Sequence, residues 1–146
     1  MKKPIPEKLR YWDTGSSSPD TWIDKTIKIL KEYGAEFHRR AHGEDMTLGQ
    51  EAFMLEFSIE GDHYRLVWPV LEPKQEKDRG KARRQAATML HHDVKARIMY
   101  ATVHGTRNAF LPMLMVPDSS GRHLPMGQVV TPELTDRIPK MLGDRK

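Results

Sequence analysis

A cluster of basic side chains in the middle of the chain is the feature with the clearest chemical potential. Between residues 74 and 97, eight lysine or arginine residues face only three acidic residues, a net charge of +5 in a chain whose total formal charge is +4. Positive charge at this density suits contacts with phosphate groups or with an acidic protein surface. The candidate contact residues are Lys77, Arg79, Lys81, Arg83 and Arg84.

The histidine and serine residues do not form a recognisable catalytic or metal-binding pattern. His91 and His92 are adjacent on a predicted helix, so their side chains point about 100° apart and are poorly placed to chelate one ion. His38 and His42 lie on a predicted strand with roughly 13 Å between them. The chain has neither a Gly-x-Ser-x-Gly turn nor a glycine-rich phosphate loop. We therefore expect solvated surface histidines, with no catalytic residues, metal site or cofactor.

Length and composition predict one domain with a substantial core. The chain has 146 residues, of which 38% are hydrophobic, and no cysteine. This length is sufficient for one ordinary domain and too short for two. The absence of cysteine excludes disulfides, thiolate nucleophiles and cysteine-ligated metals. Prolines interrupt the region after the N-terminal lysines, so we expect a cytoplasmic protein with neither a signal peptide nor a membrane span.

The first 18 residues differ in composition from the rest of the chain. Prolines, basic residues and a Gly-Ser-Ser-Ser run leave residues 1–18 little apolar surface to bury, so we expect a flexible basic arm. Tyr11 and Trp12 lie in this arm. We favour their docking on the domain over their stacking on nucleic acid bases, because exposed tryptophan is costly.

A first helix and an edge strand are predicted next. Ser18 provides an N-cap, Pro19 suits the first helical position, and Gly34 ends the helix. Residues 35–42 alternate weakly between apolar and polar side chains, which favours a strand at the edge of a sheet.

A β-hairpin over residues 53–70 gives the clearest structural pattern. Apolar and polar side chains alternate on both sides of Gly61 and Asp62. A two-residue turn at these positions predicts four facing apolar pairs: Ile59–Tyr64, Phe57–Leu66, Leu55–Trp68 and Phe53–Val70. A slip of one residue would turn one apolar set to water, so the pattern indicates a defined register.

A long second helix begins near Lys81 and ends at Gly105. Its apolar stripe consists of Ala87, Leu90, Val94, Ile98 and Ala101. Short helices are expected around residues 110–115, broken near Pro112, and again from Thr131.

Together these elements predict an α+β fold. We expect a two-layer sandwich in which a helix, a three-stranded antiparallel sheet and a long helix follow one another, with short C-terminal helices. Residues 19–116 would form this α-β-β-β-α domain, and residues 117–146 would form a loop and a short C-terminal helix.

Four motifs follow one another in a fixed order: a glycine-terminated first helix, the hairpin segment Tyr64-Arg65-Leu66, the basic helix start at residues 81–86, and Val116-Pro117-Asp118 before Gly121-Arg122. In this order they resemble a family of small uncharacterised proteins found in phage and mobile-element genomes. The similarity spans roughly residues 20–125. It implies a genomic setting and a shared fold, and no known activity.

The layout of helix, three strands and helix also resembles the double-stranded RNA-binding domain. Lys81, Arg83 and Arg84 are similar in placement to the lysines at the start of that family's second helix. The resemblance implies cations that bridge phosphates across a groove. The acidic Gly43-Glu44-Asp45 loop and the longer second helix depart from that family.

Three hypotheses for function follow. We favour a non-enzymatic nucleic-acid-binding accessory protein of phage or mobile-element origin that contacts phosphates through the start of the second helix. The alternative is a protein-interaction module, an inhibitor or assembly factor, whose same cations bind an acidic partner. An enzyme built from scattered residues is the least favoured. A homodimer is a further option, with residues 110–116 as the first candidate face.

Overall fold

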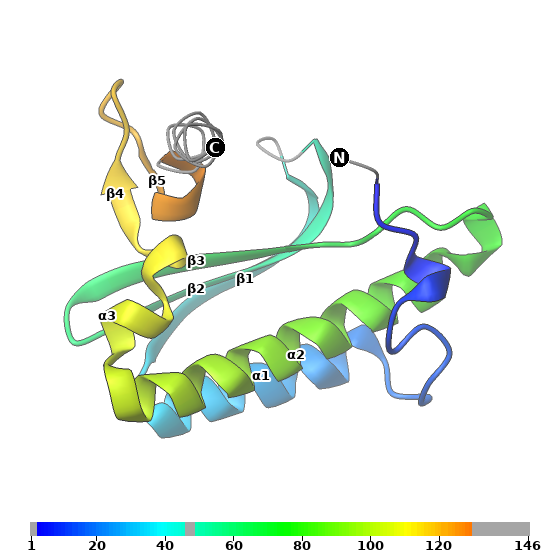
Figure 1. Cartoon of the computed structure of the whole chain (residues 1–146), viewed down its shortest axis with the longest axis horizontal. Coiled ribbons are helices and arrows are strands. Elements are labelled where there is room, and N and C mark those ends of the chain that lie inside the picture. Colours follow the sequence, from blue (N-terminus) through cyan, green and yellow to red (C-terminus); the bar gives the residue numbers. More distant parts are fainter. Residues whose placement is uncertain (1–2, 46–48, 130–146) are drawn as a thin grey trace, which may run out of the picture.

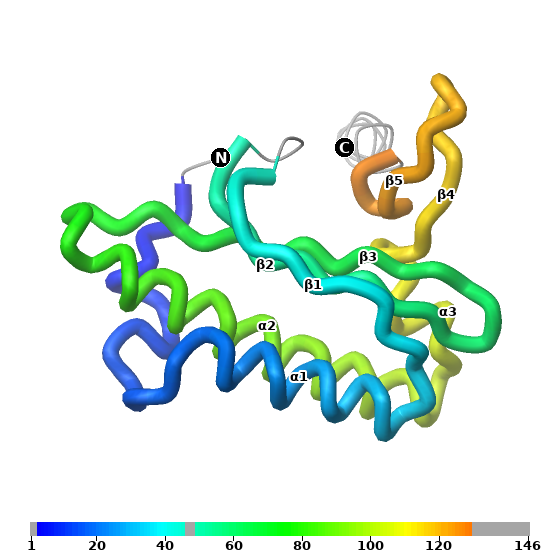
Figure 2. Tube along the Cα trace, turned by 180° about the vertical axis from the view of Figure 1, so that it is seen from behind, coloured from blue at the N-terminus to red at the C-terminus, as the bar shows by residue number. Residues whose placement is uncertain are grey.

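Two helices cover one face of a three-stranded antiparallel sheet in the computed structural model, which describes residues 3–45 and 49–129. The helices α1 (Pro19–Tyr33) and α2 (Arg79–His104) lie side by side beneath the sheet (Figures 1 and 2). The strands are arranged in the order β1 (Glu36–Asp45), β2 (Gln50–Ile59) and β3 (Asp62–Pro69). The predicted α+β layout is confirmed, and β1 is an edge strand as expected.

Helix α1 begins and ends at the residues that its sequence indicates. Ser18 has extended backbone angles, and its Oγ accepts a hydrogen bond from the Thr21 N–H at 3.3 Å. Pro19 occupies the first turn, where its missing N–H costs nothing. At the other end Gly34 has a φ of 115° and its N–H bonds the carbonyls of Leu30 and Lys31. Glycine tolerates this left-handed conformation, so the chain can leave the helix here.

The β2–β3 hairpin pairs in a register that differs from the predicted one by two residues. Phe57 faces Tyr64 rather than Leu66, and Leu55 faces Leu66 rather than Trp68. The two central residues of the turn are Glu60 and Gly61, with φ values of 52° and 85°. Positive φ at both positions is what a tight hairpin turn requires. The predicted turn at Gly61 and Asp62 was wrong, but a shift of two residues leaves the same side chains on the buried face.

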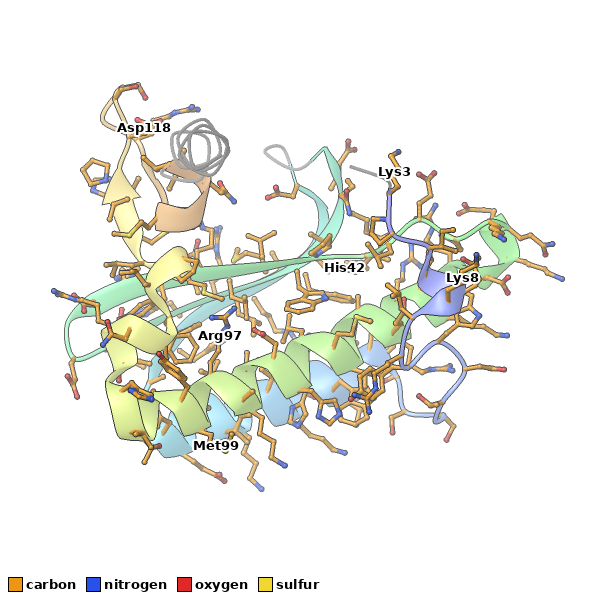
Figure 3. The ribbon with its side chains drawn as sticks, in the orientation of Figure 1. Lys3, Lys8, His42, Arg97, Met99 and Asp118 are labelled. Carbon is orange, nitrogen blue, oxygen red and sulfur yellow. The ribbon has the colours of Figure 1, made fainter. Side chains whose placement is uncertain are left out.

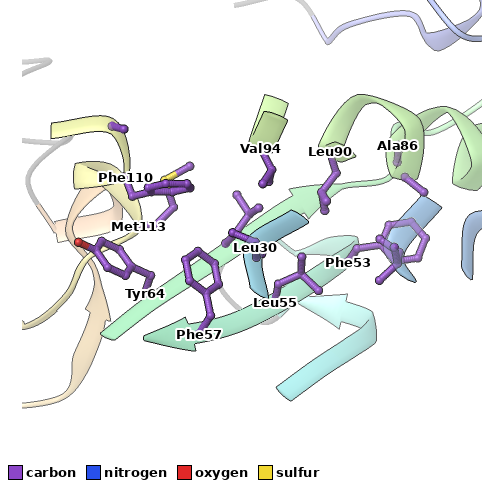
Figure 4. Packing of buried hydrophobic residues seen from close by; sticks show 14 of the residues in the cluster. Leu30, Phe53, Leu55, Phe57, Tyr64, Ala86, Leu90, Val94, Phe110 and Met113 are labelled. Atoms are coloured by element: carbon purple, nitrogen blue, oxygen red, sulfur yellow. The ribbon is translucent and has the colours of Figure 1, made fainter. Parts of the chain in front are cut away.

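The core lies between the sheet and the two helices (Figure 4). The apolar side of β2 packs against the predicted stripe of α2, in which Ala87, Leu90, Val94 and Ala101 are buried. At one end of this core the rings of Phe57, Tyr64 and Phe110 have centroids 5.6 to 5.8 Å apart. Burial, followed by the nearby Asp62 carboxylate, raises the pKa of Tyr64 to about 12, so its hydroxyl stays protonated in this core.

The segment after α2 differs from its prediction. A short helix α3 (Thr106–Ala109) leads into a 3₁₀ turn at Leu111–Met113 and then into a small hairpin of β4 (Met115–Pro117) and β5 (His123–Pro125). Pro112 lies inside this tight turn, and the chain continues as a 3₁₀ turn and a strand in place of the expected helix over residues 110–115. The predicted domain boundary after residue 116 falls inside the β4–β5 hairpin. The helix expected from Thr131 lies outside the described residues.

The first candidate face for a homodimer, residues 110–116, is partly buried in the core. Phe110 is fully buried, and Met113 is also buried. Arg97 of α2 donates a hydrogen bond to the Ala109 carbonyl at 2.9 Å and so anchors this segment to the domain. Leu114 continues the attachment through a bridge to Tyr64 of β3. Residues 110–116 therefore connect the C-terminal hairpin to the sheet, while Leu111 in this segment stays exposed.

Candidate functional site

The five predicted contact residues lie at one end of the molecule, around the start of α2. Lys77 belongs to the 3₁₀ turn at Glu76–Asp78 that precedes the helix, and it is exposed. Lys81 Nζ lies 3.6 Å from Asp13 of the N-terminal arm. Arg84 donates a hydrogen bond to the Gly15 carbonyl at 3.3 Å. The structure thus brings these residues to one region, but it gives most of them internal partners.

Glu51 at the start of β2 binds two of the five cations. Its carboxylate accepts a hydrogen bond from Arg83 Nε at 2.6 Å, and Arg79 Nη1 lies 3.8 Å away. His42 of β1 contacts the same carboxylate. Burial opposes ionisation of Glu51, but hydrogen bonds from Arg83 and His42 outweigh it and hold the pKa of this carboxyl below its usual value. This cluster joins α2 to the sheet.

Arg79 has a second carboxylate partner. Its Nε and Nη2 donate hydrogen bonds to Glu76 at 3.3 and 2.9 Å, a two-point contact within the turn that precedes α2. This contact holds the pKa of Glu76 below its usual value. Two of the five candidate contact residues, Arg79 and Arg83, are therefore paired with carboxylates of the chain itself. Their acids Glu51 and Glu76 come from β2 and from the turn itself.

The N-terminal arm packs on α2, in contrast to the flexible arm expected from composition. Gln85, which is 1% exposed, donates hydrogen bonds from Nε2 to the carbonyls of Pro6 and Arg10 at 2.8 and 3.0 Å. The Glu7 carboxylate accepts a bond from the Lys74 N–H at 2.8 Å. The first two contacts satisfy backbone carbonyls of the arm that would otherwise need water, and the third ties an arm side chain to the segment before α2.

The aromatic residues of the arm dock on the domain, as the sequence analysis favoured. Tyr11 stacks on His92 with ring centroids 5.0 Å apart and planes inclined by 12°. Trp12 packs against the hydrophobic core. One signal of this docking was available in the sequence, because Gln85 shares the apolar side of the helix with Ala82, three positions before it, and with the adjacent Ala86. Such a residue needs a hydrogen-bonding partner when buried.

Docking of the arm adds cations that the sequence analysis did not include in the candidate site. Lys3 and Lys8 lie beside the start of α2 (Figure 3). Besides Lys74, which lies next to Glu7, five cationic side chains at this end form no ion pair with a carboxylate in the described part of the chain. We call these five the basic end: Lys3, Lys8, Arg10, Lys77 and Arg84. Segments far apart in the sequence thus contribute cations to this end of the molecule.

An open groove of about 850 Å³ adjoins the basic end. It lies between the arm, the start of β2 and the chain that links β3 to α2. Its lining carries both signs of charge, with Lys3, Lys74 and Arg79 opposite Glu7, Glu44 and Glu51. Within the groove, a polyanion would therefore be attracted by the lysines and repelled by the acids. The exposed cations of the basic end, outside the groove, offer a polyanion a more favourable contact than the groove itself.

The outer face of the sheet carries a polar row that the sequence analysis did not identify. A bulge in β1 at residue 38 brings His38 Nε2 to 2.7 Å from the Ser58 Oγ, and His63 Nδ1 lies 3.0 Å from the same oxygen. The two imidazole rings stack 4.8 Å apart. Neither ring has a carboxylate partner among the described residues, so the third group of a catalytic triad is missing. The row cross-links the three strands.

The remaining histidines differ in their surroundings. His91, expected at the surface, is buried on the side of α2 that faces α1, with Nδ1 3.1 Å from the Thr26 Oγ1. Thr26 donates its own proton to the Trp22 carbonyl at 2.8 Å, so His91 is the donor in this contact. In the part of the chain that the structure describes, no three histidine or acidic side chains are grouped to hold a metal ion.

Within the described ranges, no helix has both the length and the apolar character needed to cross a membrane. Comparisons with protein-family models, with curated proteins and with solved structures found no match to this chain. The two resemblances drawn from the sequence therefore remain expectations.

Proposed function

We propose that this protein binds nucleic acid without catalysing a reaction and contacts the phosphate backbone through the basic end. The observation that carries the proposal is the docking of the arm. It gathers Lys3, Lys8 and Arg10 beside Lys77 and Arg84, and these five cations have no carboxylate partner in the described residues. Cations whose charge is not balanced by a carboxylate are available to replace the counterions of a polyanion.

The paired arginines have a different role in this proposal. Arg79 and Arg83 hold the start of α2 against Glu51, so they orient the basic end rather than contact phosphate themselves. The proposed contacts are to the backbone of the nucleic acid. Near the basic end, the described residues include neither an exposed group of aromatic side chains on which bases could stack nor an exposed row of strand side chains that could contact base edges. Sequence is then read weakly or not at all.

The dependence of affinity on salt tests the proposal. Labelled duplex DNA, single-stranded DNA and RNA are titrated with the protein at several salt concentrations, and binding is followed by fluorescence anisotropy. Five phosphate contacts predict a slope of log K against log salt of about −4 to −5 on duplex DNA. The double variant Lys8→Ala and Lys77→Ala should flatten this slope by about 2, because each lost contact removes roughly 0.9.

Two comparisons make this test specific. Lys31→Ala removes an exposed lysine in the last turn of α1, away from the basic end, and should leave the slope unchanged. Polyglutamate serves as a competitor of similar charge, and it should displace nucleic acid poorly. Absence of binding at low salt, or equal competition by polyglutamate, would refute the proposal, and the second result would favour an acidic protein partner.

Glu51→Gln provides an independent variant, which is expected to raise the affinity for nucleic acid where the lysine variants lower it. It removes one negative charge beside the basic end and releases the guanidinium group of Arg83, while Arg79 keeps its two-point contact with Glu76. Affinity for duplex DNA at low salt should increase several-fold while thermal stability falls. An unchanged or reduced affinity in a folded Glu51→Gln protein would contradict phosphate binding at this end.

A further inference from the structure

Two histidines and one serine form a row across the outer face of the sheet, near the β2–β3 turn. Ser58 of β2 lies between His38 of β1 and His63 of β3, and both histidine side chains are exposed. The Nε2 of His38 and the Nδ1 of His63 lie 2.7 and 3.0 Å from the same Ser58 Oγ. Two imidazole nitrogens from different strands therefore converge on one point at the surface.

An irregularity in β1 shapes this row. The pairing of β1 with β2 skips one residue of β1, so His38 is an extra residue in the ladder. Regular alternation would turn Arg39 toward the core, but the bulge leaves His38 and Arg39 both on the outer face. The sequence analysis compared His38 only with His42, whereas the fold brings it beside His63, with ring centroids 4.8 Å apart.

The charges close to the row balance one another. Arg39 and Arg65, in the neighbouring row of the same face, both bind the carboxylate of Glu56, at 3.1 and 2.8 Å. Glu36 is exposed and pairs with Ser58 in the β1–β2 register, which puts it on the outer face beside the histidines. Two acids thus offset the two arginines, and a cation at the row meets no excess of positive charge from them.

We infer that His38 and His63 together bind one divalent transition-metal ion of the class of Zn²⁺ and Ni²⁺. Imidazole nitrogen suits these ions and binds zinc at about 2.0–2.1 Å. The ion replaces the Ser58 hydroxyl as the group that both nitrogens contact, and water completes its coordination. The ring planes are inclined by only 2°, so one ring must turn before both lone pairs point at the metal. Both rings are exposed and this torsion is broad for histidine, so the turn costs little.

Such an ion links the two outer strands of the sheet across β2. Strand β1 pairs with a neighbour on one side only, so an ion held jointly by β1 and β3 stabilises the folded chain by mass action. Ser58 lies near one end of β2, and Glu51, beside the basic end, lies near the other. The inference therefore does not depend on nucleic acid binding.

Isothermal titration calorimetry of the full chain, without a polyhistidine tag, tests the inference with zinc chloride and nickel chloride as probes. The wild type should bind one ion per chain. His38→Gln and His63→Gln should each weaken binding at least tenfold, because a single imidazole cannot chelate. His104→Gln removes an exposed imidazole at the C-terminal end of α2, on the other side of the sheet, and should leave binding unchanged. Circular dichroism confirms that the variants are folded.

Ser58→Ala separates chelation from the hydrogen bonds of the row. It removes the hydroxyl between the rings but leaves both imidazoles, so metal binding should stay within a few-fold of the wild type. The urea midpoint of the wild type should rise with nickel concentration, whereas the midpoints of His38→Gln and His63→Gln should not. Absence of saturable binding at millimolar metal, or binding that is unchanged in both histidine variants, would overturn the inference.

Discussion

At the scale of single residues, His91 is the titratable group most affected by the fold. Burial, followed by the positive charges of His92, Lys95 and Lys25, lowers the pKa of its imidazole. The neutral ring is therefore favoured in the folded protein, while the unfolded chain binds a proton at the ordinary histidine pKa of about 6.5. Its stabilising contribution is complete above that value and is lost as the pH falls through the lowered one.

We predict that acidification from neutral pH toward pH of about 5 lowers the urea midpoint of unfolding, and that His91→Gln reduces this pH dependence. The variant also changes packing, so the measured quantity is the change of midpoint with pH rather than the midpoint itself. His123→Gln alters an exposed histidine of β5 and should leave the dependence as it is in the wild type. Equal pH dependence in the wild type and in His91→Gln would show that another group is responsible.

At the scale of elements, the arm depends on one side chain of α2. Gln85→Ala removes both hydrogen bonds to the arm, to the carbonyls of Pro6 and Arg10. Two such bonds contribute roughly 1–3 kcal/mol, so the domain should stay folded while the arm detaches. Hydrogen exchange and tryptic cleavage at Lys8 should both become faster, and the salt slope of nucleic acid binding should flatten by roughly 2 to 3 as the arm cations disperse.

Gln75→Ala provides the matched control for this element, because Gln75 is an exposed glutamine just before α2. It should change neither exchange in the arm nor binding. Protection of the arm that persists in Gln85→Ala would mean that stacking of Tyr11 on His92 holds the arm without these hydrogen bonds. An arm that is released without any change in the salt slope would count against its role in phosphate binding.

At the scale of the whole molecule, the aromatic cluster of Phe57, Tyr64 and Phe110 unites the sheet with the segment that follows α2. Phe110 is fully buried although it is remote in sequence from the hairpin. Phe110→Ala should lower the free energy of unfolding by about 3–5 kcal/mol, the usual cost of a cavity left by a buried ring. Leu111→Ala, at a position 39% exposed, should cost less than about 1 kcal/mol.

Chemical denaturation followed by both fluorescence and circular dichroism measures this effect. One coincident transition, shifted in Phe110→Ala, would show that the C-terminal hairpin and the sheet unfold together. Two separated transitions in the wild type would instead show that the hairpin is an independent unit.

The sequence by itself determined the features that depend on neighbours along the chain. The cap at Ser18, the end of α1 at Gly34, and the apolar stripes of α2 and the hairpin all follow from local backbone preference and periodicity. These features were sufficient to predict the order of the elements and the α+β class. They also located the dense positive charge at the start of α2.

Only the tertiary structure decided which charges are free. The acid that binds Arg83 is Glu51, which lies far back in the sequence on β2, and further cations at this end come from an arm attached through Gln85. Neither pairing leaves a periodic trace in the sequence. Ion pairs and single hydrogen bonds depend on the spatial positions of distant segments, whereas caps and stripes depend on the nearest few residues, and this difference in range separates what could be predicted from what could not.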